Sequence, residues 1–237
     1  MLYPERVVGR TVYRPYISFF ITITSVIVFF YLMIHAFLSH VPLEEIYRNY
    51  ALNICQVGTQ PLKETLIDGL RSLVLHMSFV HLTANIVIFY VFSSRIEEHL
   101  GHWKFLAFYL IAGFASHFSE VLFVAHNCEN PVYMVGSTGA ISGVMGAFMF
   151  LFPGVRIHSK FVVIPARLEY RIKVPAFVYL FYWFVMQFFY EVGSVAPRIN
   201  VHWGHIGGFI AGLAMIFVIS FFIPPPKTTS YVPELDD

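Results

Sequence analysis

The distribution of charged residues is the feature that most constrains the fold of this 237-residue chain. Four long stretches contain no Asp, Glu, Lys or Arg, and two more are each interrupted by a single glutamate. A charge at the centre of a bilayer costs about 2.5 to 3.5 kcal/mol on insertion scales, so uncharged stretches of about 20 residues indicate transmembrane helices. We therefore expect six spans, near residues 16–38, 77–95, 104–125, 136–153, 173–194 and 201–223.

The composition supports this class and excludes others. Charged residues make up only 12% of the chain, about half the share found in soluble domains. The formal net charge of +1 provides no positive field to neutralise phosphates, so nucleic acid is not an expected partner. Two cysteines are too few for a disulfide scaffold or a Cys-rich metal cluster. We expect an all-α polytopic membrane protein, with residues 1–237 forming a single membrane domain embedded in the lipid bilayer.

The positions of Lys and Arg predict the orientation of the spans. Eleven of them lie on the side that holds both termini and four on the other side, so the positive-inside rule predicts that both termini are cytoplasmic. The first uncharged run is too long for the apolar region of a signal peptide, so we expect it to remain as an anchor. The first outer loop, about 40–76, is the one sizeable loop expected, and its apolar residues predict that it lies partly in the membrane interface.

Three spans that are not adjacent in sequence carry polar side chains at the same depth, in the outer half of the membrane. Span four carries Ser137 and Thr138, span six carries His205, and span two carries His81 and Asn85 one helical turn apart on one face. Each residue alone has an ordinary explanation, such as a Thr bonded to the preceding turn or a His anchored at the interface. Because polar groups inside a membrane are functional hypotheses by default, their convergence predicts a site.

Small residues on spans four and six predict close contact between these two helices. Glycines recur there every four residues: Gly139 and Gly143 on span four, and Gly204, Gly208 and Gly212 on span six. This spacing lets helix backbones touch. Packing alone accounts for the pattern, but the same contact would bring Thr138 and His205 within hydrogen-bond reach.

Three motifs follow one another along the chain: His81–Asn85 (HLTAN), Gly136–Gly143 (GSTGAISG) and Gly204–Phe209 (GHIGGF). In this order, on spans two, four and six, they resemble the rhomboid intramembrane serine proteases, with Glu98–Gly101 (EHLG) as a further match at the inner end of span two. The likeness covers roughly residues 73–213 and implies a rhomboid-like bundle of six helices.

The resemblance implies a role for each matching residue. His205 matches the general base of the family, and His81 and Asn85 match the side chains that stabilise the oxyanion together with the backbone N–H of the nucleophile. Gly208 matches the glycine that packs span six against span four. One position departs from the family pattern Gly-x-Ser-Gly, because Thr138 stands where the nucleophilic serine is expected and Ser137 fills the free position.

The implied activity is hydrolysis of single-span membrane proteins near the outer leaflet, with no cofactor. Thr138 and His205 would form a hydroxyl–imidazole dyad, because the glutamates at 120 and 191 lie near outer span ends, where they are expected to act as interfacial caps. Ser137 is a fallback nucleophile, although a rotation of about 100° per residue turns it away from His205. The short tails resemble those of bacterial family members, which predicts the plasma membrane.

Other chemistries fit the sequence less well. A zinc protease motif His-Glu-x-x-His is missing from the sequence, and the aspartates at 68, 236 and 237 lie outside the spans, which excludes an aspartyl dyad. The main alternative is a pseudoprotease that binds transmembrane segments without cutting them, because the Cβ methyl of Thr138 restricts χ1. A transporter or channel is the alternative from another class. Cys55 and Cys128 are both expected outside, as unrelated thiols rather than a disulfide.

Overall fold

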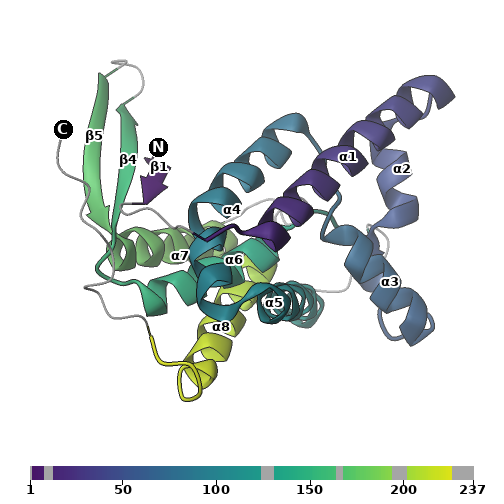
Figure 1. The fold of residues 1–237 in the computed structure, drawn as a ribbon. Helices are drawn as coiled ribbons and strands as arrows, with labels where there is room; N and C mark the ends of the chain where they lie inside the picture. Colours follow the sequence, from purple (N-terminus) through teal and green to yellow (C-terminus); the bar gives the residue numbers. More distant parts are fainter. Residues whose placement is uncertain (1, 8–12, 124–130, 164–167, 194–201, 226–237) are drawn as a thin grey trace.

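The computed structural model describes residues 2–7, 13–123, 131–163, 168–193 and 202–225. Six of its helices coincide with the six expected spans (Figure 1). They are α1 (Tyr16–Ser39), α4 (Phe79–Leu100), α5 (His102–Phe123), α6 (Thr138–Leu151), α7 (Ala176–Gly193) and α8 (His202–Ile219). The fold is therefore the helical bundle of a polytopic membrane protein.

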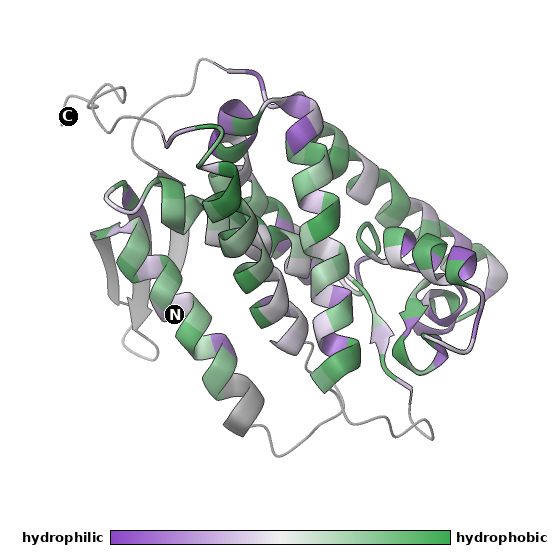
Figure 2. Cartoon of the chain, turned by 90° about the horizontal axis from the view of Figure 1, so that it is seen from below, coloured by the Kyte–Doolittle hydropathy of each residue, from purple (hydrophilic) through white to green (hydrophobic). Residues whose placement is uncertain are grey.

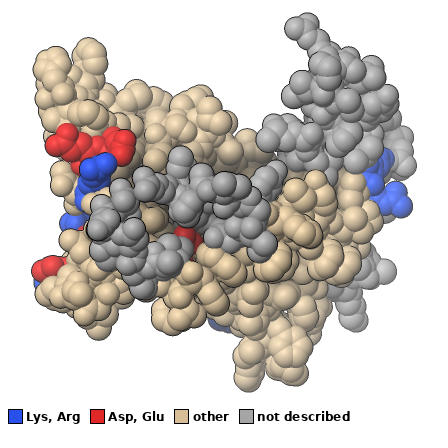
Figure 3. Space-filling model, turned by 180° about the vertical axis from the view of Figure 1, so that it is seen from behind, with Lys and Arg blue, Asp and Glu red and all other residues tan. Residues whose placement is uncertain are grey.

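The surface of the bundle is suited to lipid. Helices α1, α4 and α5 are long and apolar enough to cross a membrane by length and composition, and α6, α7 and α8 contribute shorter apolar segments. Figure 2 shows that most of these helices are hydrophobic along their length, with hydrophilic residues gathered mainly toward their ends. The charged side chains visible in Figure 3 are few and lie mainly toward the edges of that face.

Helix α6 forms the centre of the bundle, between α4, α5, α7 and α8 (Figure 1). Its side chains are small where neighbouring helices approach, and Ala140, Val144 and Ala147 are fully buried. Phe148 lies lower on the same helix, where its ring packs edge-on against Phe92 of α4 at 5.1 Å between centroids. A helix enclosed in this way holds its first turn in a defined place, and that turn carries Thr138.

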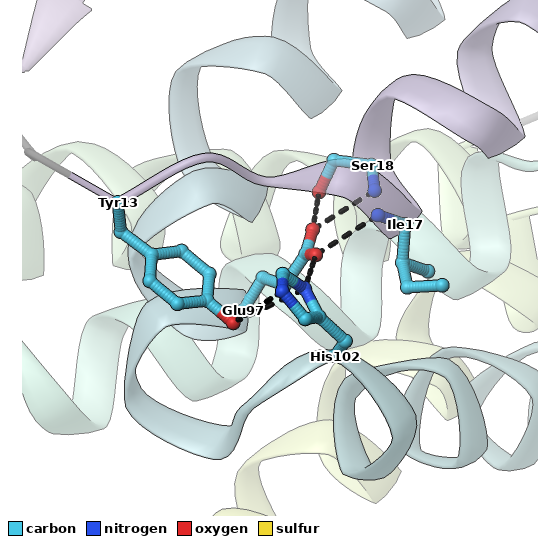
Figure 4. Close-up of polar contacts among 5 residues, drawn as sticks. All are labelled: Tyr13, Ile17, Ser18, Glu97 and His102. Carbon is cyan, nitrogen blue, oxygen red and sulfur yellow. Dashed lines mark hydrogen bonds and ion pairs between the residues drawn. The ribbon is translucent and has the colours of Figure 1, made fainter.

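A buried carboxylate in the last turn of α4 joins the start of α1 to the start of α5 (Figure 4). Glu97 is completely buried and accepts hydrogen bonds from the backbone N–H groups of Ile17 and Ser18, both at 2.9 Å. It also accepts from the Ser18 hydroxyl at 2.6 Å and lies 2.6 Å from Nδ1 of His102. Because these donors include the first N–H groups of α1, the carboxylate also compensates the positive end of that helix dipole.

Strands accompany the helices, although none was expected from the sequence. β1 (Leu2–Val7), β4 (Arg156–Val163) and β5 (Leu168–Pro175) form an antiparallel sheet in the order β1-β4-β5. In Figure 1 the β4–β5 hairpin extends away from the helices, beside β1. The hairpin connects α6 to α7, so this connection is longer and more ordered than expected. Its sequence alternates charged and apolar residues, as in Arg171-Ile172-Lys173-Val174, a pattern that favours a strand over a membrane helix.

The first loop is folded and holds the start of α6. It contains α2 (Leu43–Tyr50), the short 3-10 helix η1 (Ile54–Gln56) and α3 (Leu62–Ser72). Ser72 makes the key contacts, because its hydroxyl accepts from Leu52 N at 2.8 Å and its carbonyl accepts from Gly136 N at 3.0 Å. A short pairing of β2 (Leu52–Asn53) with β3 (Tyr133–Met134) ties the loop to the segment before α6. Cys55 lies in η1, whereas Cys128 lies outside the described residues.

Candidate active site

The turn before α6 places Thr138 at the first position of that helix. Gly136 has φ of +122°, which favours glycine, and an added Cβ would lie 2.8 Å from Cε1 of His81. Ser137 is the N-cap residue, and α6 begins at Thr138. The first N–H groups of a helix have no acceptor within the helix, so the Thr138 N–H is a donor at the positive end of the helix dipole.

The hydroxyl of Thr138 contacts both polar side chains of α4. Its Oγ1 donates to Oδ1 of Asn85 at 3.1 Å and lies 3.1 Å from Nε2 of His81. Because a hydroxyl has one proton, Nε2 of His81 must then be the donor. The Ser78 hydroxyl, which caps α4, accepts from the His81 N–H at 3.1 Å and so fixes the turn that carries His81. The structure thus brings together the hydroxyl, imidazole and carboxamide of spans four and two.

Asn85 retains a donor for a further group. Its side chain is 4% exposed, and its Nδ2 has no hydrogen-bond partner among the described residues. It lies beside a small cavity that His76 and Ser137 also line, together with Ile21 and Ser25 of α1. An unpaired buried amide donor costs free energy, so this group is suited to an oxygen that enters the site.

Helices α6 and α8 are in backbone contact through their glycines. An added Cβ on Gly208 would lie 2.1 Å from the carbonyl oxygen of Gly139, and one on Gly212 would lie 2.0 Å from that of Gly143. Near the N-terminal ends of the two helices, an added Cβ on Gly139 would lie 3.5 Å from the carbonyl oxygen of Gly204. The neighbours of these two residues are Thr138 and His205. A direct hydrogen bond between Thr138 and His205 stays a prediction.

His205 is contacted from α7. Its Nδ1 lies 3.0 Å from Oε1 of Gln187, and its ring is 6.3 Å from the ring of Trp183 between centroids. Sequence reasoning missed Gln187, because a single uncharged amide does not interrupt a hydrophobic span. Its presence among the aromatic residues of α7 was the one available signal.

Glu120 requires a correction, because it is not an interfacial cap. The residue is 1% exposed, and its Oε2 accepts from the backbone N–H of Gly204 at 2.7 Å. The neighbouring Ser119 hydroxyl donates to the Trp203 carbonyl at 2.9 Å. Helix α5 therefore compensates the first turn of α8, which carries His205, with a buried carboxylate. From the sequence alone, a glutamate that caps a neighbouring helix cannot be distinguished from a glutamate that marks the end of a span.

Ser137 points to a different imidazole. Its Oγ lies 3.4 Å from Nε2 of His76, and the two side chains are 4% and 1% exposed. Nδ1 of His76 lies 3.2 Å from the Val74 carbonyl oxygen. Burial, with a smaller contribution from His81, lowers the pKa of His76 to about 4. The Tyr47 hydroxyl donates to the His76 carbonyl, and burial raises the pKa of Tyr47 to about 12.

Comparison with known proteins identifies the family. The model of the rhomboid domain matches residues 63–222, which is more than half of the chain, and the protein belongs to the rhomboid family. RHOMBOID-like protein 6, mitochondrial, from Arabidopsis thaliana is 26% identical over 145 residues, which cover 61% of this chain and 41% of that protein. Rhomboid-like protease 3 from Toxoplasma gondii is 25% identical over 144 residues, covering 61% of this chain and 48% of the relative.

A shorter match is closer in sequence. Human presenilin-associated rhomboid-like protein, mitochondrial, is 38% identical over 88 residues, which cover 37% of this chain and 23% of that protein. In all three cases the match spans less than half of the relative's length. Within the described residues, no group of three or more His, Cys, Asp or Glu is arranged to hold a metal ion.

Proposed function

We propose that this protein is an intramembrane endopeptidase that cleaves transmembrane segments of membrane proteins near the outer leaflet. The observation that carries the proposal is the set of polar contacts at the start of α6, where Thr138 meets His81 and Asn85 beside the helix that bears His205. These groups have little packing value, and burying polar groups in an apolar bundle costs free energy unless they are paired. Membership of a protease superfamily agrees with this chemistry.

The mechanism uses His205 as general base. As Oγ1 of Thr138 attacks the scissile carbonyl carbon, its proton passes to His205, and a tetrahedral intermediate forms. His81, the free Nδ2 of Asn85 and the Thr138 N–H are the donors for the oxyanion. When the intermediate collapses, His205 gives the proton to the leaving amine and an ester to Thr138 remains. Water, deprotonated by His205, then releases the ester and restores the hydroxyl.

The alternative function is binding of transmembrane segments without cleavage. It is favoured by one feature, the Cβ methyl of Thr138, which restricts χ1 while Oγ1 is engaged with Asn85. In that state the hydroxyl proton is directed to Asn85. A rotation of the side chain is then required before His205 receives the proton.

A cleavage assay separates the two functions. Purified protein is mixed in detergent with a generic single-span substrate, and the products are identified by mass spectrometry. We expect cleavage by the wild type, none by His205→Ala, and a rate at least about tenfold higher for Thr138→Ser, equivalent to about 1.4 kcal/mol of transition-state stabilisation. If Thr138→Ser stays silent while the folded protein still binds the substrate, the non-cleaving function is correct. Loss of cleavage in Ser137→Ala but not in Thr138→Ala would instead make Ser137 the nucleophile.

We place the protein in the plasma membrane with both termini cytoplasmic. The support is the excess of Lys and Arg on the side of the termini, eleven against four. Two relatives named above are mitochondrial by name, so an organellar membrane is the competing location. A membrane-impermeant thiol reagent tests the orientation. It should label Cys55 in reduced intact cells, and labelling only after permeabilisation would reverse the assignment.

A further inference from the structure

The ring of His205 is held by two side chains of α7, a helix that carries none of the expected site residues. Gln187 Oε1 lies 3.0 Å from Nδ1 of His205, and the Trp183 ring is tilted by 36° against the imidazole. Gln187 and Trp183 are four residues apart on α7 and therefore lie on one face of the helix. The amide contacts one ring nitrogen, and the indole lies beside the imidazole at 6.3 Å between ring centroids.

We propose that Gln187 is a positioning residue that selects the tautomer of His205. A neutral imidazole has one N–H and one lone pair, and a carbonyl oxygen accepts but cannot donate. The contact with Oε1 therefore favours a proton on Nδ1 and leaves the lone pair on Nε2. Nε2 is the ring nitrogen that Gln187 does not contact, and in the proposed mechanism it is the atom that accepts the proton of the Thr138 hydroxyl. This inference rests on the proposed function, in which His205 is the base.

The choice of an amide suits the surroundings. In hydroxyl–histidine–carboxylate triads the third group holds the imidazole in the correct tautomer, and an amide serves the same purpose in some cysteine proteases. A glutamate at position 187 would place a further charge within a helix rich in aromatic residues, where burial of an unpaired charge is costly. The neutral side chain gives the orientation without that cost, and Oε1 continues to accept when His205 becomes protonated during the reaction.

Two variants separate orientation from packing. Gln187→Met keeps the length and flexibility of the side chain but removes the acceptor, whereas Gln187→Glu keeps an acceptor at the same reach. The matched control is Phe188→Leu, the next residue along α7, whose side chain is 46% exposed and makes no part of the proposed site. Circular dichroism and thermal unfolding in detergent identify any variant that fails to fold.

The first measurement needs no substrate. Nitrogen-15 NMR of histidine-labelled protein at about pH 8 distinguishes the two neutral tautomers, with the His205 signals assigned from their loss in His205→Gln. We expect Nδ1–H in the wild type, in Phe188→Leu and in Gln187→Glu, and a shift toward Nε2–H in Gln187→Met. An Nε2–H tautomer in the wild type would mean that the amide is rotated and donates to Nδ1, and it would overturn the proposal.

The second measurement is hydrolysis of the single-span substrate, carried out in the wild type and in a Thr138→Ser background. Gln187→Met should lower kcat by roughly tenfold or more and leave KM within about twofold. Gln187→Glu should keep most of the rate measured with glutamine at this position. An unchanged tautomer together with an unchanged kcat in Gln187→Met would refute the role. If no variant cleaves, the proposed function fails, but the tautomer measurement still decides whether Gln187 orients His205.

Discussion

Substitution of Gly208 by alanine tests the backbone contact between α6 and α8, the helices that carry Thr138 and His205. The added Cβ would lie 2.1 Å from the carbonyl oxygen and 2.9 Å from the carbonyl carbon of Gly139. Real Cβ atoms essentially never show contacts under 3.0 Å, so the helices would have to separate by roughly 0.9 Å. The obstructing atoms are backbone and cannot rotate away. The strain must therefore be relieved by movement of a whole helix.

Helix α5, which packs against both α6 and α8, restricts that movement. An added Cβ on Gly139 would lie 1.8 Å from the Ser116 hydroxyl of α5, and one on Gly143 would lie 2.5 Å from Cβ of Ala112. Because α5, α6 and α8 all pack closely against one another, we expect Gly208→Ala to destabilise the bundle by about 1 to 3 kcal/mol, the usual cost of overpacking. A shift of about 1 Å between Thr138 and His205 should also slow hydrolysis by roughly 100-fold, or about 2.7 kcal/mol.

The control is Gly154→Ala, because an added Cβ at Gly154 meets nothing within 4 Å. Unfolding is followed by circular dichroism during titration with a denaturing detergent, and cleavage is measured as the initial rate on a single-span substrate. Gly154→Ala should match the wild type in both assays. If Gly208→Ala unfolds at the same detergent concentration as Gly154→Ala, the helices are not in backbone contact and the reasoning is wrong, whether or not the protein cleaves the substrate.

Three further predictions concern buried polar groups. Glu97→Gln should lower the free energy of unfolding by about 2 to 3 kcal/mol, because an amide replaces one acceptor oxygen by a donor among the N–H groups of α1; equal stability in detergent titration would contradict it. Glu120→Gln should be more stable than Glu120→Ala, since glutamine still accepts from Gly204 N; the reverse order would exclude the capping role. His76 has a folded pKa of about 4 against 6.5, so only the unfolded state gains a proton in this interval. Stability should therefore fall as the pH drops from about 6.5 to 4, by on the order of 3 kcal/mol. His76→Gln should remove this dependence while the exposed His35→Gln retains it, and the same thermal-unfolding pH profile in both variants would disprove it.

The helices and the main site residues were accessible from sequence because both depend on position along a helix axis. Charge-free stretches mark where a helix enters and leaves the bilayer, and depth is then nearly linear in residue number at about 1.5 Å per residue. Counting in this way placed Thr138 level with His81 and Asn85, and the structure brings these three side chains into contact. Glycine spacing likewise located the seam between α6 and α8.

The remaining contacts depend on which way each helix is turned and on its neighbours. Glu120 was interpreted as the end of a span, because a search for charged residues assumes that every carboxylate is exposed to water. Its partner is a backbone N–H of α8, which no side-chain pattern reveals. Gln187 was missed for a related reason, since its contact with His205 arises only when α7 packs against α8. The β4–β5 hairpin was not predicted from the sequence. A search for charged residues detects its lysines and arginines but misses the alternation of charged and apolar residues that is typical of a strand.

The side chains around Thr138 bear on whether its methyl group ends catalysis. A bundle that only packs helices gains most from apolar contacts at this depth, and each buried polar group costs free energy unless it is paired. Yet Gln187 engages His205, Glu120 engages the first turn of α8, and Asn85 keeps an unpaired donor among the described residues. Glu120 also stabilises the contact between α5 and α8, whereas Gln187 and Asn85 fit the proposed mechanism, in which a base and an oxyanion are held. Their presence favours a catalytic hydroxyl at position 138 over a site that binds a transmembrane segment without cleaving it.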